Sequence, residues 1–165
     1  MNTVIIKNIE KQDFKDMEEL YSVSLKDNQK GFIQDPSFRG GIKEFVSSLN
    51  TNKGILLGLY SEDKLIGMGA LKKHNNSDIE LCKLHLCPGY KGKGYGKMLA
   101  LALINKAIGL EYQRLILHVT KTQEAAIGLY CKLGFQKTKE ELSQIEVSNE
   151  LLDFDTVFME MNLKK

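Results

Sequence analysis

The chain has 165 residues, of which 42% are hydrophobic and 27% charged, and its formal net charge is +2. These values are typical of one globular domain that can bury a core, so residues 1–165 are taken as a single domain. The small net charge argues against a nucleic-acid partner. No apolar stretch reaches the length of a membrane span, which argues against a membrane partner.

Apolar spacing predicts an alternation of strands and helices along the chain. In chain order, we expect a strand at Val4–Lys7, a helix from Asp13, a loop at Asp27–Gly41, a helix at Ile42–Leu49, and a hairpin of strands at Ile55–Tyr60 and Leu65–Leu71. There follow a strand at Ile79–Cys87, a helix at Lys97–Leu110, a strand at Leu115–Val119, a helix at Gln123–Leu133, a strand from Phe135, and a last strand at Thr156–Leu163. This order predicts a mixed sheet covered by helices.

A glycine-rich loop separates the strand at Ile79–Cys87 from the next helix. It consists of Lys91, Gly92, Lys93, Gly94, Tyr95, Gly96 and Lys97. A helix start that follows glycines presents free amides, and its dipole favours an anion. A dinucleotide fingerprint would need a third glycine at position 97 or 99, where the chain has Lys97 and Leu99. A Walker loop would need glycine at 91 and Ser or Thr at 98, where the chain has Lys91 and Met98. The spacing therefore excludes both nucleotide motifs.

Three segments carry a family resemblance in their order and spacing. They are the strand Glu-Leu-Cys-Lys-Leu-His-Leu-Cys-Pro at 80–88, the loop Lys-Gly-Lys-Gly-Tyr-Gly at 91–96, and the helix Ala-Ile-Gly-Leu-Tyr-Cys-Lys-Leu-Gly-Phe at 126–135. Together they resemble the GNAT superfamily of N-acetyltransferases, which bind acetyl-CoA. The resemblance implies an α/β, GNAT-like acyl-CoA N-acyltransferase fold, with a mixed central sheet of about six or seven strands and helices on both faces. The chain departs from the family pattern at Lys91, where Gln or Arg is usual.

The same resemblance implies that acetyl-CoA is the acetyl donor. Amides from Lys91 to Lys97 would hold the pyrophosphate, because glycines let the main chain come close to phosphates. The thioester arm would lie along Leu84–Leu86, where the family strand parts from its neighbour at a bulge. The expected cofactor contacts are Leu84, His85, Leu86, Lys91, Gly92, Lys93, Gly94, Tyr95, Gly96, Lys97, Gln123 and Tyr130. The alternative is a turn whose lysines are merely solvated.

Glu80 is the expected proton acceptor. An amine with a pKa near 10 is almost wholly protonated at neutral pH, so acetyl transfer needs a base. Glu80 lies in an otherwise apolar strand, where desolvation would raise the pKa of its carboxyl group toward the range of a base. The resemblance places it where some family members have their general-base glutamate. The alternative is a strand-end carboxylate that pairs with a surface lysine.

Tyr130 is the expected proton donor. The resemblance places it where the family has the tyrosine that protonates the departing coenzyme A thiolate, four residues before Gly134. The alternative is a core tyrosine, because Tyr130 shares a helical face with apolar residues. His85 and His118 lie in strands near the expected site, but an isolated strand histidine is more often a packed or edge residue, and neither is assigned to catalysis.

The three cysteines predict a cytoplasmic protein without disulfides or a metal. Cys82, Cys87 and Cys131 are odd in number, all lie in apolar contexts, and their spacing suits no common zinc pattern. They are therefore expected to be buried free thiols. The first residues carry no signal-peptide pattern.

Two segments, Asp27–Gly41 and Lys139–Asp155, are expected to build the acceptor pocket. The second carries six carboxylates against one lysine, namely Glu140, Glu141, Glu146, Glu150, Asp153 and Asp155 against Lys139. That excess could steer a cationic amine toward the site; the alternative is a solvated, charged surface.

The predicted function is transfer of an acetyl group from acetyl-CoA to a primary amine of a small cationic molecule, by direct attack in a ternary complex. The alternatives are a non-catalytic module that binds acyl-CoA, and an acetyltransferase that acts on a protein or peptide amine. The sequence leaves the oligomeric state open, a homodimer included.

Overall fold

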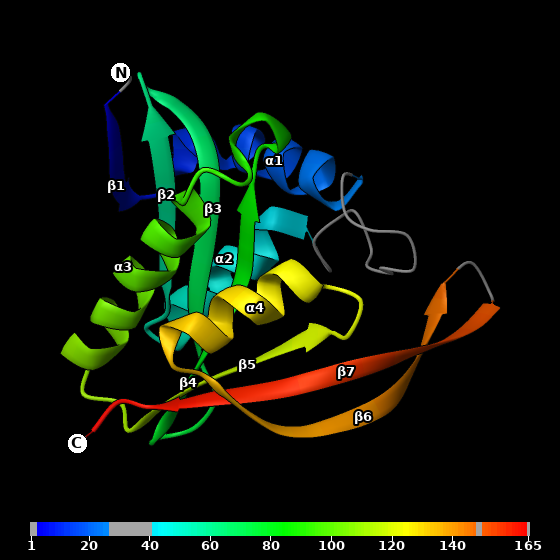
Figure 1. The fold of residues 1–165 in the computed structure, drawn as a ribbon. Helices are drawn as coiled ribbons and strands as arrows, with labels where there is room; N and C mark the ends of the chain where they lie inside the picture. The colour runs from blue at the N-terminus through cyan, green and yellow to red at the C-terminus, as the bar shows by residue number, and fades with distance from the viewer. Residues whose placement is uncertain (1–2, 27–40, 148–149, 165) are drawn as a thin grey trace.

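The structure, a computed structural model, describes residues 3–26, 41–147 and 150–164 (Figure 1). Its elements are β1 (Val4–Asn8), a 3₁₀ turn (Lys11–Asp13), α1 (Phe14–Lys26), α2 (Gly41–Thr51), β2 (Ile55–Ser61), β3 (Lys64–Lys73), β4 (Asp78–Leu86), a second 3₁₀ turn (Pro88–Tyr90), α3 (Tyr95–Gly109), β5 (Arg114–Thr120), α4 (Glu124–Leu133), β6 (Gln136–Val147) and β7 (Glu150–Asn162). The predicted order of strands and helices is confirmed. The loop expected at Asp27–Gly41 lies outside the described residues, except that Gly41 begins α2.

The described strands form one mixed seven-stranded sheet in the order β1-β2-β3-β4-β5-β7-β6. Neighbours are antiparallel except β4 and β5, which run parallel. The helix α3 makes the crossover between these two strands, as parallel neighbours require. The single parallel pair is the feature that positions the candidate site.

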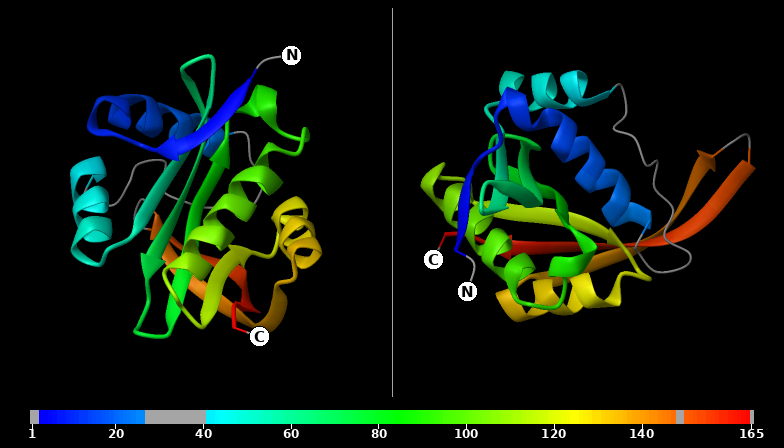
Figure 2. Two further views of the ribbon diagram at one scale, coloured as in Figure 1. Left: turned by 90° about the vertical axis from the view of Figure 1, so that its left-hand side faces the viewer. Right: turned by 90° about the horizontal axis from the view of Figure 1, so that it is seen from above.

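Helices cover both faces of the sheet, with α1 and α2 on one face and α3 and α4 on the other (Figure 2). On the face of α3, Leu99 and Leu103 are fully buried in a cluster that includes Leu115 of β5. On the face of α1, Met17 and Tyr21 pack in a second cluster with Met68 of β3. Burying a side chain of this size stabilises the fold by about 1.5–3 kcal/mol. These two apolar layers hold the sheet between the helices, as predicted.

The strands β6 and β7 form a longer hairpin than the sequence predicts. A last strand was expected to begin at Thr156, whereas β7 begins at Glu150 and pairs with β6 as far as Val147. The ladder between β5 and β7 stops at Thr120 and Thr156, so the rest of the hairpin extends beyond β5 (Figure 1). The segment is rich in charged residues, and its apolar alternation is confined to short stretches at 145–147 and 152–154. The pairing of the two strands therefore could not be predicted from it.

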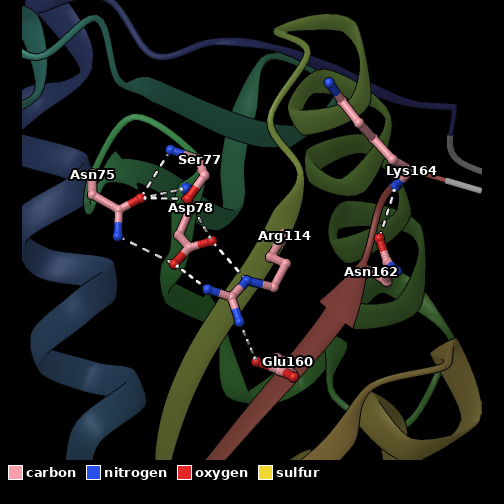
Figure 3. A network of polar contacts seen from close by, with 7 residues as sticks. All are labelled: Asn75, Ser77, Asp78, Arg114, Glu160, Asn162 and Lys164. Atoms are coloured by element: carbon pink, nitrogen blue, oxygen red, sulfur yellow. Dashed lines mark hydrogen bonds and ion pairs between the residues drawn. The ribbon is translucent and has the colours of Figure 1, made fainter.

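A network of polar contacts surrounds Asp78 and Arg114, the first residue pair of the parallel ladder between β4 and β5 (Figure 3). Arg114 of β5 donates two hydrogen bonds to Asp78 of β4, Nε to Oδ1 at 2.9 Å and Nη2 to Oδ2 at 3.0 Å. Its Nη1 lies 3.5 Å from Glu160 of β7. Asn75 accepts a 2.7 Å hydrogen bond from the amide of Asp78 and donates one of 3.2 Å to its carboxylate. Three adjacent strands are thereby joined at one end.

Candidate active site

The candidate site lies where the two parallel strands part. Pairs between β4 and β5 are Asp78 with Arg114, Ile79 with Leu115, and Glu80 with Ile116. Beyond that third pair β4 continues to Leu86 and β5 to Thr120, and Figure 1 shows the two strands diverging. Among the described strands, none pairs with the edge of Leu84–Leu86 that faces away from β3. That edge can therefore accept an extended ligand as an added strand would.

A bulge in β4 accompanies the divergence. Cys82 pairs with Ala70 and His85 with Met68, so two residues of β4 face one of β3. Lys83 lies in the bulge with φ of 56°, a conformation that non-glycine residues rarely adopt. The resemblance implied a bulge in this strand, and the structure contains it.

The glycine loop lies at the end of β4 and begins α3. Gly92 and Gly94 have φ of 76° and 88°, and a Cβ at either position would meet nothing within 4 Å. The first hydrogen bond of the helix runs from the amide of Met98 to the carbonyl of Gly94 at 3.1 Å. The amides of residues 95–97 precede that bond, so they can donate to an anion. Open space in front of a left-handed glycine turn suits a phosphate-bearing ligand.

Gln123 and Gly96 bring α4 and α3 to the same opening. A Cβ on Gly96 would lie 3.7 Å from side-chain atoms of both Leu86 and Leu129, so the start of α3 lies beside β4 and α4. Gln123 precedes α4. Its backbone N–H donates a 2.9 Å hydrogen bond to the carbonyl of Thr120 at the end of β5. Its side-chain Nε2 is buried and has no hydrogen-bond partner within the described residues. An unsatisfied buried donor costs about 1–3 kcal/mol, and a polar group of a ligand would satisfy it.

Tyr130 combines a buried ring with an uncommitted hydroxyl group. The residue is 7% exposed, and its ring contacts that of Phe135 edge-on at a centroid distance of 5.5 Å. Within the described part of the chain, its hydroxyl makes no hydrogen bond. Burial, with a smaller contribution from the charge of Cys82, raises the pKa of Tyr130. The side chain is therefore part of the core, and its hydroxyl stays protonated at neutral pH, as a proton donor must.

Glu80 pairs with a histidine rather than with a lysine. Its Oε1 lies 3.1 Å from Nε2 of His118, and the side chains are 20% and 59% exposed, respectively. Burial alone would raise the pKa of Glu80, but the hydrogen bond and charge of His118 outweigh it and hold that pKa below its ordinary value. The expectation of a raised pKa at Glu80 is therefore wrong, because the neighbouring strand supplies a histidine that donates a hydrogen bond to the carboxylate. The hydrogen bond that His118 donates to Glu80 raises the pKa of His118 above its ordinary value.

Sequence reasoning missed this pair. One pattern in the sequence could have indicated it, namely the alternation of side chains between the two faces of a strand. Glu80 alternates with the core residues Ile79 and Leu81, and His118 follows the core residue Leu117. Both side chains therefore lie off the α3 face, but only the parallel register brings them together.

His85 is a packed residue. Its Nδ1 lies 3.2 Å from Oγ of Ser24, and its ring contacts that of Tyr21 edge-on at 4.9 Å. Burial first, then the charges of Lys83 and Lys91, lowers the pKa of His85 to about 3, so its imidazole is neutral.

The three cysteines are free, as expected, but the expectation that all are buried is wrong, because Cys82 and Cys87 are only partly buried. Cys131 of α4 is exposed, whereas its neighbour Tyr130 is buried. Burial raises the pKa of Cys82 to about 12. No group of His, Cys, Asp and Glu side chains in the described ranges has the size and arrangement to hold a metal ion. No helix of the described residues combines the length and apolar character that crossing a membrane requires.

Two carboxylates of the acidic hairpin are already paired. Glu140 forms ion pairs with Lys121 and Lys137, and Glu141 pairs with Lys139 at 2.8 Å. Within Lys139–Asp155 the sequence contains one lysine for six carboxylates. The fold brings two further lysines to them from neighbouring segments, namely Lys121 and Lys137.

In this site β4 separates from its parallel neighbour β5 at a bulge and then leads into a glycine loop. This arrangement can be compared with known families. Residues 14–135 match the sequence model of the acetyltransferase (GNAT) family. The chain belongs to the GNAT family. An uncharacterized N-acetyltransferase of Bacillus pumilus is 29% identical to it over 113 residues, which is 62% of this chain. The chain spans 66% of the length of that relative, less than two thirds.

Solved GNAT structures share the whole fold. An N-acetyltransferase from Staphylococcus aureus Mu50 superposes with a TM-score of 0.83 at 17% identity, covering 98% of this chain and 99% of the other. A phosphinothricin acetyltransferase of the GNAT superfamily from Sinorhizobium meliloti, solved with acetyl-CoA, superposes with a TM-score of 0.81 at 20% identity, covering 97% and 88%. At these identities the likeness shows the fold, and the predicted GNAT-like fold is confirmed.

Proposed function

We propose that this GNAT-family chain is an acetyl-CoA-dependent N-acetyltransferase that acetylates a primary amine of a small cationic molecule by direct attack in a ternary complex. The observation that carries the proposal is the opening between β4 and β5, which begins beyond Glu80 and leads to the glycine loop. Because all three cysteines are free thiols, we place the reaction in the cytoplasm.

The donor would be held by main-chain groups along this opening. The free edge of Leu84–Leu86 suits the amides of pantetheine, and the amides at the start of α3 suit the pyrophosphate. Gln123 supplies a buried donor that lacks a partner in the described residues. Lys91, Lys93 and Lys97 add positive charge around the loop. These groups together would fix the thioester at the point where the strands part.

In the reaction the amine nitrogen forms a bond to the thioester carbon while the carbon–sulfur bond breaks. The protonated amine loses one proton before it attacks and a second as the amide forms, and both pass to solvent through an acceptor at Glu80, either directly or through an intervening group. Tyr130 donates its hydroxyl proton to the departing sulfur and regains a proton from solvent. Proton transfer of this kind contributes about 10²–10⁴ in rate. The products are the acetylated amine and coenzyme A with a free thiol.

The proposal that the acceptor is cationic is based on the acidic residues of the β6–β7 hairpin. The segment Lys139–Asp155 has an excess of carboxylates, and Asp155 is exposed near the base of the hairpin. Ion pairs neutralise Glu140 and Glu141 in part, so the remaining acids would do the steering.

The test is release of free thiol from acetyl-CoA with a panel of cationic, neutral and anionic amines and peptides. Turnover with small cationic amines is expected, and a matched measurement on Tyr130→Phe would show a large loss. Faster turnover with neutral or anionic amines would overturn the cationic acceptor, and a preference for peptides would indicate a protein acetyltransferase. Tight acetyl-CoA binding without turnover on any acceptor would instead support a non-catalytic acyl-CoA-binding module.

A further inference from the structure

We infer that His118 takes the proton from the acceptor amine and that Glu80 acts through it, as the residue that holds and charges the imidazole. The inference rests on the proposed function and names a further catalytic residue for it. Four observations support it: the position of the pair in the sheet, the exposure of each side chain, the imidazole nitrogen that carries the hydrogen, and the charges around the pair.

The pair spans the point where the strands part. Glu80 belongs to the last β4–β5 pair, opposite Ile116, whereas His118 lies two residues farther along β5, where that ladder has ended. The 3.1 Å contact therefore runs from the joined part of the sheet to the open part. Of the two side chains, that of His118 comes from the segment that borders the opening.

The exposure of the two side chains differs in the same direction. The Glu80 side chain is 20% exposed and that of His118 is 59% exposed. The ring of His118 also contacts Phe158 of β7 at a centroid distance of 5.9 Å, which supports one side of the imidazole. A group that receives a proton from a bound amine and passes it to solvent must be reachable by both. His118 meets that requirement better than Glu80.

The hydrogen bond defines the roles of the imidazole nitrogens. A carboxylate can only accept, so Nε2 of His118 carries the hydrogen in the contact with Glu80. In the neutral ring Nδ1 is then the basic nitrogen, and it can take the amine proton. The imidazolium that results keeps its hydrogen bond to Glu80, and the proton leaves to solvent after the acetyl group has moved.

Charges on neighbouring elements act on both members. Lys72, which pairs with Glu80 in the β3–β4 ladder, and His74 stabilise the carboxylate. On β4 itself, Lys83 opposes protonation of His118, whereas the hydrogen bond and charge of Glu80 favour it. The net result is a pKa of Glu80 below its ordinary value and one of His118 above it, so the imidazole is the stronger base of the two. Efficient general bases have a pKa near the operating pH.

The test compares His118→Gln, Glu80→Gln and a matched control, Glu111→Gln, which replaces an exposed carboxylate in the turn before β5. For His118→Gln we expect kcat to fall by about 10²–10³ at neutral pH while the KM for acetyl-CoA stays the same. The acid limb of the kcat/KM profile should also disappear. For Glu80→Gln we expect a smaller loss and an acid limb displaced to lower pH, because the carboxylate no longer favours the imidazolium. Glu111→Gln should match the wild type.

A second readout does not depend on turnover. Nuclear magnetic resonance should show that Glu80→Gln lowers the imidazole pKa of His118, whereas Glu111→Gln leaves it unchanged. A His118 pKa that does not respond to Glu80→Gln would overturn the inference. So would a His118→Gln enzyme that retains its rate and acid limb while Glu80→Gln loses both, because Glu80 would then be the direct base. Absence of turnover by the wild-type chain on every amine would overturn the proposed function itself.

Discussion

Arg114 donates two hydrogen bonds, of 2.9 and 3.0 Å, to the carboxylate of Asp78. The two residues form the first of the three residue pairs in the parallel ladder between β4 and β5. The two strands separate after the third pair, so this contact and its neighbours hold the closed end of the opening. Asp78 is 5% exposed. Burial alone would raise its pKa, but hydrogen bonds from Arg114 and Asn75 outweigh burial and lower it.

Asp78→Asn is therefore expected to destabilise the fold. It removes a charged acceptor from a network of charge-assisted hydrogen bonds, and we expect the free energy of unfolding to fall by about 1–3 kcal/mol at neutral pH. Because the pKa of Asp78 is lowered by folding, its contribution is present above the ordinary value of 3.8 and is lost as the pH falls through the lowered value. The difference between wild type and variant in urea unfolding should thus shrink at acid pH. A difference that grows on acidification would contradict this account; the exposed Asp155→Asn serves as a neutral control.

Tyr130→Phe should separate activity from stability. The ring that packs against Phe135 is kept, and the lost hydroxyl has no hydrogen-bond partner in the described residues, so the melting temperature should hardly change. If Tyr130 protonates the thiolate, kcat should fall by roughly 10²–10³.

Tyr60→Phe is the opposite control for this experiment. The Tyr60 hydroxyl donates to Asp13 at 2.9 Å on the face of α1, and its loss should cost stability of about 1–2 kcal/mol without lowering kcat. Equal kcat values for Tyr130→Phe and wild type would refute the role of Tyr130.

Gly94→Ala should weaken donor binding. Gly94 has φ of 88°, which costs a residue with a Cβ about 1–2 kcal/mol, and the new methyl group would stand in the space in front of the loop. We expect the KM for acetyl-CoA to rise by about 5- to 30-fold, as this energy implies. Gly109→Ala at the end of α3 is the matched control, because that glycine has ordinary φ and open surroundings. Isothermal titration with coenzyme A would measure both variants, and equal affinities would count against the loop as the donor site.

Cys82→Ala should leave acetyl transfer largely intact. A thiol whose pKa is raised to about 12 is almost wholly protonated at neutral pH and is a poor nucleophile. Direct attack by the amine requires no acetylated cysteine, so intact mass spectrometry after incubation with acetyl-CoA alone should show no adduct at Cys82. An acetyl adduct that disappears in Cys82→Ala, together with lost activity, would favour a two-step reaction.

Local patterns determined much of the fold and the donor half of the site. Apolar spacing is a property of neighbouring residues, so the helices at α3 and α4 and the strands from β2 to β5 could be predicted from it. The glycine spacing at 92–96 excluded nucleotide motifs, because each glycine meets a local demand on φ or on close approach. The loop together with the strand before it and the helix at 126–135 indicated the GNAT family. Gly134, with φ of 107°, ends α4 as its sequence position predicted.

Only the tertiary structure decided how distant charges meet. The partner of Glu80 depends on the parallel register of β4 and β5, which are joined through α3, and no local pattern sets that register. Without it, burial predicted a raised pKa for Glu80; with His118 at 3.1 Å the direction is reversed. The acidic hairpin likewise gained Lys121 and Lys137 as partners. The sequence by itself thus determined the family and the donor loop through short-range constraints, and the fold decided the electrostatics of the acceptor side, because Coulomb interactions depend on distances across strands that the chain order does not contain.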